Sequence, residues 1–301
     1  MHISTLLRGC MVASITAVSS FSFAQKVVTT EKTGQLETLI TEAEREKTPS
    51  LRVVGPINGE DIQVIRTMCG RDYSGYESEG TTRTLDLSEA LIKEAGKNYL
   101  NEQLGFYNRF YAPSADNEIG IKMFYRCEPL REIILPKTTT VIAGQAFDNC
   151  TSLTKCTFFA GLTTIRQYAF RNTKLTNVEL PSTLTAMENK VFDGCKELTT
   201  VMFTSKAVPT LPDELFSNCP KLKTVIVPQE SLEAYKAALK LPEGVTIEGR
   251  AGITAVRSAA ASAAVVEVAR FDLEGRRLAQ PQKGVNIVHY SNGTTAKVVV
   301  R

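Results

Sequence analysis

The sequence predicts an α+β repeat fold, because one short pattern recurs five times along residues 119–228. The pattern reads Phe-x-x-Cys-x-x-Leu-x-x-Val-x-Leu-Pro, and its copies begin 22 to 24 residues apart, at Phe124, Phe147, Phe170, Phe192 and Phe216. An apolar residue stands five positions before each phenylalanine, and a leucine stands five or six positions after it. Apolar residues held in phase at such a period are the signature of a leucine-rich repeat solenoid, here with coils of about 23 residues.

Each copy predicts one strand and one return limb. In the first copy Ile133 and Leu135 flank Ile134, which gives the two-residue period of a strand and turns Ile134 away from the core. A proline, which cannot donate to a ladder, ends the strand in three copies, at Pro136, Pro181 and Pro228. Each coil offers about five large apolar groups, worth about 1.5–3 kcal/mol each when fully buried. No coil can bury them alone, so we expect stacked coils with capped ends.

The first 24 residues are typical of a signal peptide. Arg8 precedes a mostly apolar run, Met11–Val18, and Ser22-Phe23-Ala24 has the small-x-small form of a cleavage site. The apolar run is too short to span a bilayer, and no later segment is a candidate transmembrane helix. We therefore expect cleavage near Ala24-Gln25 and a protein that is secreted or held on the cell surface, outside the outer membrane.

Composition narrows the classes of partner. The chain is 43% hydrophobic, which is ordinary for a globular protein. Its formal net charge is +3, and removal of the leader leaves +2, because Arg8 is the only formal charge there. This balance is too small to indicate binding of nucleic acid or of a membrane surface.

The chain divides into five parts. They are the signal peptide (1–24), an N-terminal cap with a first degenerate repeat (25–118), the solenoid with a capping helix (119–250), a linker (251–264) and a small β-module (265–301). Residues 25–50 favour one amphipathic helix with Leu36, Leu39, Ile40 and Ala43 on one side. We expect Ser231–Leu239 to form a short helix that covers the last coil.

Between the first helix and the regular copies, the sequence predicts two strands and a second helix. Leu51–Val54 is predicted to be a strand that ends at Gly55-Pro56. Asn58 can cap a helix whose Ile62, Ile65 and Cys69 share a face. Thr84–Ser88 is predicted to be a repeat strand in a degenerate copy.

An aromatic segment, residues 106–120, is inserted before the first regular copy. Its Phe106, Tyr107, Phe110 and Tyr111 could form an exposed patch or could pack against the N-terminal cap. Aromatic side chains bury large areas wherever they reach a core. We therefore expect the packed arrangement.

The C-terminal residues predict a linker and then strands. Ser258–Ala264 is rich in Ala and Ser, as linkers are. Alternating apolar residues follow at Val266/Val268, Arg276–Leu278, Val285–Tyr290 and Ala296–Val300. Ser291-Asn292-Gly293-Thr294 is a strong hairpin-turn signal. So short a module can hold only a marginal core.

Six cysteines remain after the leader, and an even count in an exported chain raises the question of disulfides. Four of them share one repeat position, where the third copy carries Thr173. Paired strands lie about 5 Å apart, so Cys127–Cys150 and Cys195–Cys219 bridges are within reach. Buried free thiols are the alternative, and we expect it. Zinc-like Cys-x-x-Cys spacing is absent, so the sequence indicates no metal and no other cofactor.

The residue inventory argues against an enzyme. The only histidines are His2, in the leader, and His289, in the tail, so a Ser-His-Asp or Cys-His arrangement in the main domain is excluded. No phosphate-cradling glycine loop or His-Glu-x-x-His helix occurs. The acidic pairs Glu60-Asp61 and Asp213-Glu214 fit helix starts or plain solvation better than acid–base catalysis.

The remaining candidate site is the side of the repeat strands that points away from the core, here named the strand face. Solenoids bind partners through such concave surfaces. Ile134, Met202 and Ile226 are apolar at these positions and favour binding, whereas threonine also suits a solvated sheet. The candidate ligand-binding residues are Arg131, Ile134, Lys155, Thr157, Asn177, Glu179, Thr200, Met202, Thr224 and Ile226.

The repeat resembles the BspA-like leucine-rich repeat family of bacterial surface proteins. The resemblance rests on Ala146–Leu153, Val191–Cys195 and the Leu-Pro strand ends at 135–136 and 180–181. It is strong over about 119–228 and weaker over 51–92. The third copy departs from the family at Phe170–Leu175, which is one residue short and has no Cys. The resemblance implies adhesion to host or neighbouring-cell proteins, without catalytic residues.

The tail resembles the C-terminal sorting modules that the type IX secretion system reads in Bacteroidetes. Phe271-Asp272-Leu273 with Gly275-Arg276, the step Lys283-Gly284-Val285 and the basic end carry this similarity, although the segment is shorter than the full module. It implies contact with export machinery.

Together these observations lead to one main hypothesis, an exported binding or adhesion protein that takes an extracellular protein or glycan ligand on its strand face. The alternative is a structural scaffold of the cell envelope without a host ligand.

Overall fold

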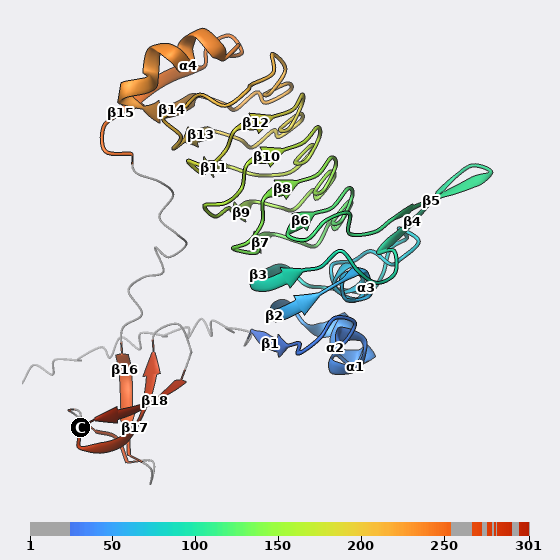
Figure 1. The fold of residues 1–301 in the computed structure, drawn as a ribbon, viewed down its shortest axis with the longest axis vertical. Coiled ribbons are helices and arrows are strands. Elements are labelled where there is room, and N and C mark those ends of the chain that lie inside the picture. Colours follow the sequence, from blue (N-terminus) through green and yellow to red (C-terminus); the bar gives the residue numbers. More distant parts are fainter. Residues whose placement is uncertain are drawn as a thin grey trace, which may run out of the picture.

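The computed structural model of the chain describes residues 25–253, 267–272, 276–278, 280, 282–290 and 295–300. The predicted signal peptide, residues 254–264 of the predicted linker and the predicted turn 291–294 lie outside the described residues. Residues 25–250 form a stack of coils that runs from β1 (Lys26–Thr29) at one end to α4 (Leu232–Ala238) at the other (Figure 1). The stack is a parallel repeat, as the sequence predicts.

One side of the stack carries the repeat strands. They are β7 (Glu132–Ile134), β9 (Lys155–Thr157), β11 (Asn177–Leu180), β13 (Thr200–Phe203), β14 (Thr224–Pro228) and β15 (Thr246–Arg250). Three earlier strands, β1 (Lys26–Thr29), β2 (Ser50–Ile57) and β3 (Thr84–Ile92), continue this side. Strand order is β1-β2-β3-β7-β9 in one sheet and β11-β13-β14-β15 in another, and all neighbours in both sheets are parallel. No strand pairing joins β9 to β11 within this described part, so the strand side is divided at the short third copy.

The return limbs form a third parallel sheet across the core. Its strands are β6 (Glu118–Ile119), β8 (Val141–Ile142), β10 (Thr164–Ile165) and β12 (Ala186–Met187), in the order β12-β10-β8-β6. Each strand ends on the apolar residue that stands five positions before a repeat phenylalanine. This sheet continues across the coils where the strand side is divided.

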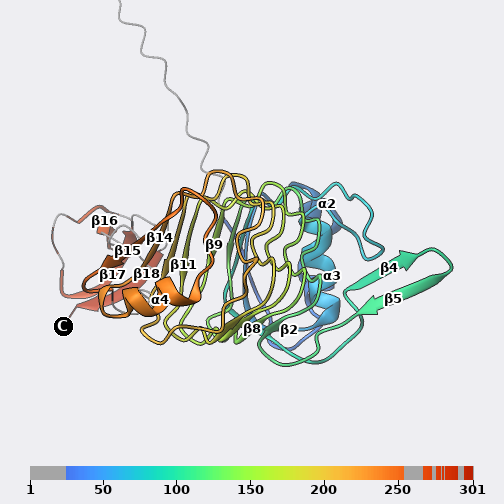
Figure 2. The same ribbon diagram turned by 90° about the horizontal axis from the view of Figure 1, so that it is seen from above.

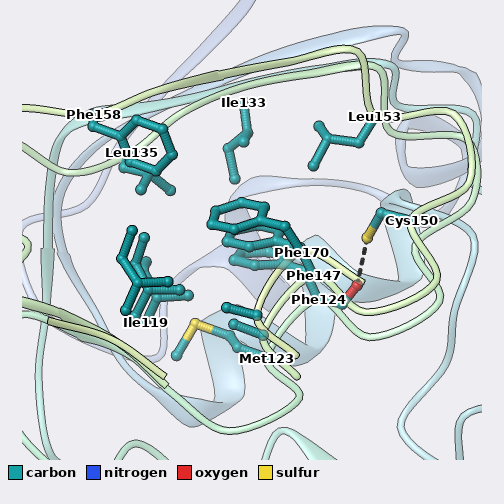
Figure 3. Packing of buried hydrophobic residues seen from close by; sticks show 14 of the residues in the cluster. Ile119, Met123, Phe124, Ile133, Leu135, Phe147, Cys150, Leu153, Phe158 and Phe170 are labelled. Carbon is teal, nitrogen blue, oxygen red and sulfur yellow. Dashed lines mark hydrogen bonds between the residues drawn. The ribbon is translucent and has the colours of Figure 1, made fainter. Parts of the chain in front are cut away.

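The repeat phenylalanines stack in a column between the two sides (Figure 3). Successive ring centroids from Phe124 to Phe216 lie 5.3, 5.1, 5.8 and 6.0 Å apart, and the planes are nearly parallel. All five rings are buried. Because each ring touches rings of adjacent coils, burial of any one coil depends on its neighbours, as expected for a solenoid.

The turn after each phenylalanine has a left-handed residue. Two positions after the ring, φ is positive at Arg126, Asn149, Asn172, Gly194 and Asn218. Asn and Gly adopt this conformation most readily, which accounts for their recurrence here. The N–H groups at this position donate to the next coil, for example from Asn149 to the Arg171 carbonyl at 2.9 Å.

The N-terminal segment differs from the single helix predicted over residues 25–50. It contains β1 (Lys26–Thr29), α1 (Leu36–Leu39) and α2 (Glu42–Lys47). Ile40 is extended, and Thr41 begins a new helix with a capping box to Glu44. The Glu44 carboxylate accepts from the Thr41 N–H and from the Thr41 hydroxyl, both at 2.9 Å, and this contact marks the start of the second helix.

The predicted strand at 51–54 is longer than expected. β2 (Ser50–Ile57) continues through Gly55-Pro56 and pairs with β3 (Thr84–Ile92) along its length. β1 pairs with β2 only up to Val54. Pro56 therefore lies where one side of β2 has no neighbouring strand, a position that tolerates a missing N–H.

Helix α3 (Gly59–Met68) begins at Asn58 as predicted and joins the N-terminal segment to the repeat. Asp61 accepts from the backbone N–H groups of Gly34 and Leu36 at 2.6 and 2.9 Å. Arg66 is fully buried and donates to the carbonyls of Lys122 and Met123 at 3.2 and 2.9 Å. The helix is thus bonded to α1 on one side and to the first regular coil on the other.

The last coil is covered by η1 (Gln229–Ser231) and α4 (Leu232–Ala238). Tyr235 of α4 is buried against Phe203, and its hydroxyl donates to the Ser205 carbonyl at 2.9 Å. β15 then adds a further parallel strand to β14.

The described part of the tail is an antiparallel sheet. It contains β16 (Glu267–Phe271), β17 (Gly284–Tyr290) and β18 (Thr295–Val300), in the order β16-β17-β18. The strand predicted at Arg276–Leu278 is reduced to an isolated bridge between Phe271 and Arg277.

Candidate binding surfaces

The strand face consists of two rows of side chains set by strand register. One row, row A, contains Glu132 and Lys155 on β7 and β9, then Asn177, Thr200, Thr224 and Thr246 on the second sheet. The other row, row B, contains Ile134 and Thr157, then Glu179, Met202, Ile226 and Glu248. Nine of the ten candidate residues fall on these rows. Arg131 does not, because it precedes β7, where it is exposed.

Row B places two apolar side chains between two acidic ones. Met202 and Ile226 are paired neighbours, and the exposed Glu179 and Glu248 border them on β11 and β15. At about 4.8 Å per strand, the two carboxylate-bearing strands are about 14 Å apart. Neither Glu179 nor Glu248 has an ion pair among the described residues. From β11 to β15, row B therefore has an acidic side chain on each side of an apolar centre.

Ile226 corrects the prediction of an open position. It is only 7% exposed, although it belongs to the outer row and not to the main core cluster. Met202 and Glu248 border it from the two neighbouring strands, and these longer side chains account for its cover. Met202 and Ile134 are half-buried.

Row A is polar and partly paired within itself. Lys155 Nζ lies 2.5 Å from a Glu132 carboxylate oxygen. Beside the rows, threonine hydroxyls donate to the preceding coil, as from Thr199 to the Thr176 carbonyl at 2.9 Å and from Thr154 to the Arg131 carbonyl at 3.1 Å. These threonines hold neighbouring coils together.

Glu248 is a site residue that the sequence analysis missed. It lies on β15, which follows the last regular copy and pairs with β14. The alternation Val245-Thr246-Ile247-Glu248 is the signal that could have revealed this strand.

The aromatic insertion forms a hairpin of β4 (Leu100–Leu104) and β5 (Tyr107–Tyr111). It projects from the stack beside α3 (Figure 2). The expectation that its aromatics pack against the cap is wrong for three of the four. Phe106 is fully exposed, and Tyr107 and Phe110 are 67% and 54% exposed, while Tyr111 alone is buried. The hairpin turns these side chains away from the stack, beyond the reach of its core.

The six cysteines in the described part of the chain are free thiols. At the shared repeat position, the cysteine thiol donates a hydrogen bond to a carbonyl of the preceding coil. Cys150 Sγ donates to the Phe124 carbonyl at 3.0 Å (Figure 3), and Cys195 Sγ donates to the Phe170 carbonyl at 3.1 Å. Thr173 makes the same kind of bond within its own coil, from Oγ1 to the Phe170 carbonyl. Burial raises the pKa of Cys195 to about 11 and of Cys219 to about 12. Such thiols are weak nucleophiles.

The described ranges contain no group of three or more His, Cys, Asp or Glu side chains placed to hold a metal ion. None of the helices described there is long and apolar enough to cross a bilayer. A depression of about 330 Å³ beyond β12, lined in part by Gln167, Glu188 and Leu211, is open to solvent.

The parallel coils, the buried phenylalanine column and the outward strand rows define a leucine-rich repeat fold. Residues 117–240 match the family model of the BspA type leucine rich repeat region, in six copies. The match counts one copy more than the five regular ones.

The chain is also similar to solved bacterial structures. A leucine rich repeat protein of T. pallidum is 24% identical, with a TM-score of 0.39 and coverage of 56% of this chain and 75% of that one. A leucine-rich repeat protein from Bacteroides ovatus is 18% identical, with a TM-score of 0.37 and coverage of 70% and 53%. The pneumococcal vaccine antigen PcpA is 11% identical, with a TM-score of 0.39 and coverage of 67% and 68%. No curated protein matches the chain at a significant level.

Proposed function

We propose that the chain is an exported binding protein that takes an extracellular protein or glycan on its strand face, without enzymatic activity. The observation that carries this proposal is row B, where the apolar pair Met202 and Ile226 lies between Glu179 and Glu248. Met202 is only half-buried, so part of an apolar side chain stays open at the centre of an otherwise polar face. A binding face gains an apolar centre with a polar rim, which is the usual anatomy of an interface.

The charges of row B indicate the chemistry of the ligand. Two exposed carboxylates on strands about 14 Å apart favour a partner that presents cationic groups on either side of an apolar one. The polar row A, with its exposed Asn177 and half-buried Thr200, supplies hydrogen-bond donors and acceptors alongside. Among extracellular ligands, a basic protein segment fits this pattern better than a neutral glycan.

The proposal is tested by binding of residues 25–250 to panels of matrix proteins and glycans. For any ligand found, Met202→Glu should weaken binding by at least tenfold, because it places a third carboxylate in the apolar centre. Thr138→Glu, at an exposed position outside the rows, is the matched control and should leave binding unchanged. Binding that survives Met202→Glu would place the ligand elsewhere.

Failure of the whole panel would favour the alternative, a scaffold of the cell envelope without a host ligand. Two further proposals, on the caps and on the tail, apply to either function. Helices α1–α3 and α4 act as caps on the two ends of the stack, and the tail from residue 265 serves export. The position of α4 over the last coil and the buried Tyr235 support the first of these.

A further inference from the structure

The three outer residue pairs of the β4–β5 hairpin are ordered in layers. Strand register places Leu104 opposite Tyr107, Gln103 opposite Asn108, and Glu102 opposite Arg109. Gly105 and Phe106 close the end. Moving from the end toward the stack, the hairpin is therefore first apolar and aromatic, then amide-bearing, then charged.

The apolar end, here named the tip, consists of Leu104, Phe106 and Tyr107. All three side chains are exposed, and both figures of the fold show the hairpin extending beyond the stack. An exposed apolar group of this kind marks an interaction site when it gathers in one place. The tip is convex. It can therefore insert into a membrane or into a partner's surface, but it offers no concave site for a ligand.

The base of the hairpin is fixed, so the tip keeps its direction. Tyr111 is buried, its hydroxyl donates to Glu102 at 2.8 Å, and its carbonyl accepts from the Tyr99 N–H at 2.8 Å. Lys122 of the first regular coil donates to both oxygens of Glu102, at 2.7 and 2.6 Å. The carboxylate is thereby neutralised at the foot of the hairpin.

Arg109 is the charge that remains available. It is exposed, its guanidinium carbon lies 5.4 Å from the Tyr111 ring centroid, and it forms no ion pair with any described residue. The charged layer of the hairpin is thus cationic toward solvent. An anionic partner surface complements it.

We propose that this tip inserts into the interfacial region of a lipid bilayer that carries anionic headgroups. Arg109 lies two residues behind Tyr107, or about 7 Å at the rise of a strand. This is within the depth of about 5–10 Å to which interfacial segments bury their apolar side chains. At that depth the tip reaches the acyl boundary, the amides of Gln103 and Asn108 reach the carbonyl level, and Arg109 meets the phosphates.

The layering favours a bilayer over a second copy of this chain as the partner of the tip. Aromatic rings are enriched at membrane interfaces because they suit a boundary that is apolar on one side and wet on the other. A second copy of this chain fits less well. Antiparallel pairing of β5 with its own copy about the central residue would set Arg109 against Arg109, and like charges opposite each other destabilise a sheet pair. The small net charge of the whole chain is compatible with the proposal, because the contact is local.

The chain contains no tryptophan, which gives the test a clean reporter. In the full mature chain with Phe106→Trp, the tryptophan emission should shift to the blue when vesicles of phosphatidylcholine with phosphatidylglycerol are added. Brominated lipid in these vesicles should quench that emission. The matched control, Leu39→Trp on α1, is also exposed and should show neither effect. Vesicles of phosphatidylcholine alone should bind more weakly, and Arg109→Ala should reduce binding to the anionic vesicles about fivefold.

One double variant and one concentration series decide the outcome. Phe106→Ser with Tyr107→Ser should abolish vesicle binding while the melting temperature stays at that of the parent, because both side chains are exposed. The proposal is overturned if Phe106→Trp shows no shift with anionic vesicles, or if the double variant still binds them. It is also overturned by a blue shift that grows with protein concentration in the absence of lipid, which would identify a second copy as the occupant.

Discussion

Arg171 reaches back one coil and donates two hydrogen bonds to Asp148, from Nε at 2.9 Å and from Nη2 at 2.6 Å. Both residues stand one position after a repeat phenylalanine, so they belong to the same column of the solenoid. Asp193 occupies this position in the next coil and also acts on the Arg171 charge. The irregular third copy therefore places a cation between two carboxylates, and the Asp148 side chain is fully buried there.

Restoring the aspartate of the neighbouring copies at this position should destabilise the protein. Arg171→Asp would set three carboxylates in one column and leave buried Asp148 without its partner. We expect the free energy of unfolding to fall by about 2–4 kcal/mol, less than for a fully buried pair because the Arg171 side chain is 29% exposed. Urea denaturation measures this, with Arg166→Asp, exposed in the same coil, as control. Equal stability of the two variants would contradict the role of the column.

Phe147→Ala should cost about 3–5 kcal/mol of unfolding free energy, because it opens a cavity in the middle of the ring column. The same substitution at the half-exposed Phe110 should stay within about 0.5 kcal/mol. Thermal melting of both variants checks the assignment. A parent-like melt for Phe147→Ala would show that the column carries little of the stability.

The cysteine column should be reduced and unreactive. Because burial raises the pKa of Cys195 to about 11 and of Cys219 to about 12, their thiolate population at pH 8 is small. We expect a thiol reagent to label these residues only after denaturation. Replacement of both by Thr, as the chain already has at Thr173, should preserve folding with a modest loss. A Cys195–Cys219 bridge in mass spectra of the unreduced protein would contradict this prediction.

Acidification should loosen the foot of the hairpin. Burial alone would raise the pKa of Glu102, but hydrogen bonds from Lys122 and Tyr111 outweigh it, and the pKa lies below its ordinary value. The contact therefore stabilises the folded state above the ordinary carboxyl pKa and is lost as pH falls through the lowered value. Amide exchange of β4 and β5 should accelerate over that range relative to β13. Glu102→Gln should remove this pH dependence.

Removal of residues 258–301 should leave the melting temperature of the stack nearly unchanged. The tail strands pair only with one another within the described part of the chain. Truncation after Pro228 should instead lower the melting temperature, because it removes the buried Tyr235. In the native host, the first truncation should retain the protein inside the envelope. Arrival of that truncated protein at the surface would contradict a sorting role.

The repeat was predictable because each copy carries its pattern within a short stretch of sequence. The spacing of Phe124, Phe147 and Phe170 already fixes which side chains share the core, and both sheets follow from it. Thr41 shows where such reasoning fails, since one capping side chain divides a segment whose apolar period suits a single helix.

The binding surfaces were less predictable, because exposure depends on neighbours that are distant in the sequence. Ile226 is covered by Met202 and by Glu248 of an unpredicted strand. Phe106 is exposed because its hairpin leads away from the stack, although its composition favours burial. The pairing of Arg171 with Asp148 likewise requires the coil register.

The division between β9 and β11 has a mechanical consequence. Across it the strand side keeps a backbone bond from the Lys174 N–H to the Leu153 carbonyl at 2.9 Å, while the return limbs remain joined through β8, β10 and β12. A pulling force transmitted along the stack, as on an anchored protein held by a ligand in flowing liquid, would concentrate at this seam. The strand side would part there first, and the return sheet would act as the spine about which the two blocks bend.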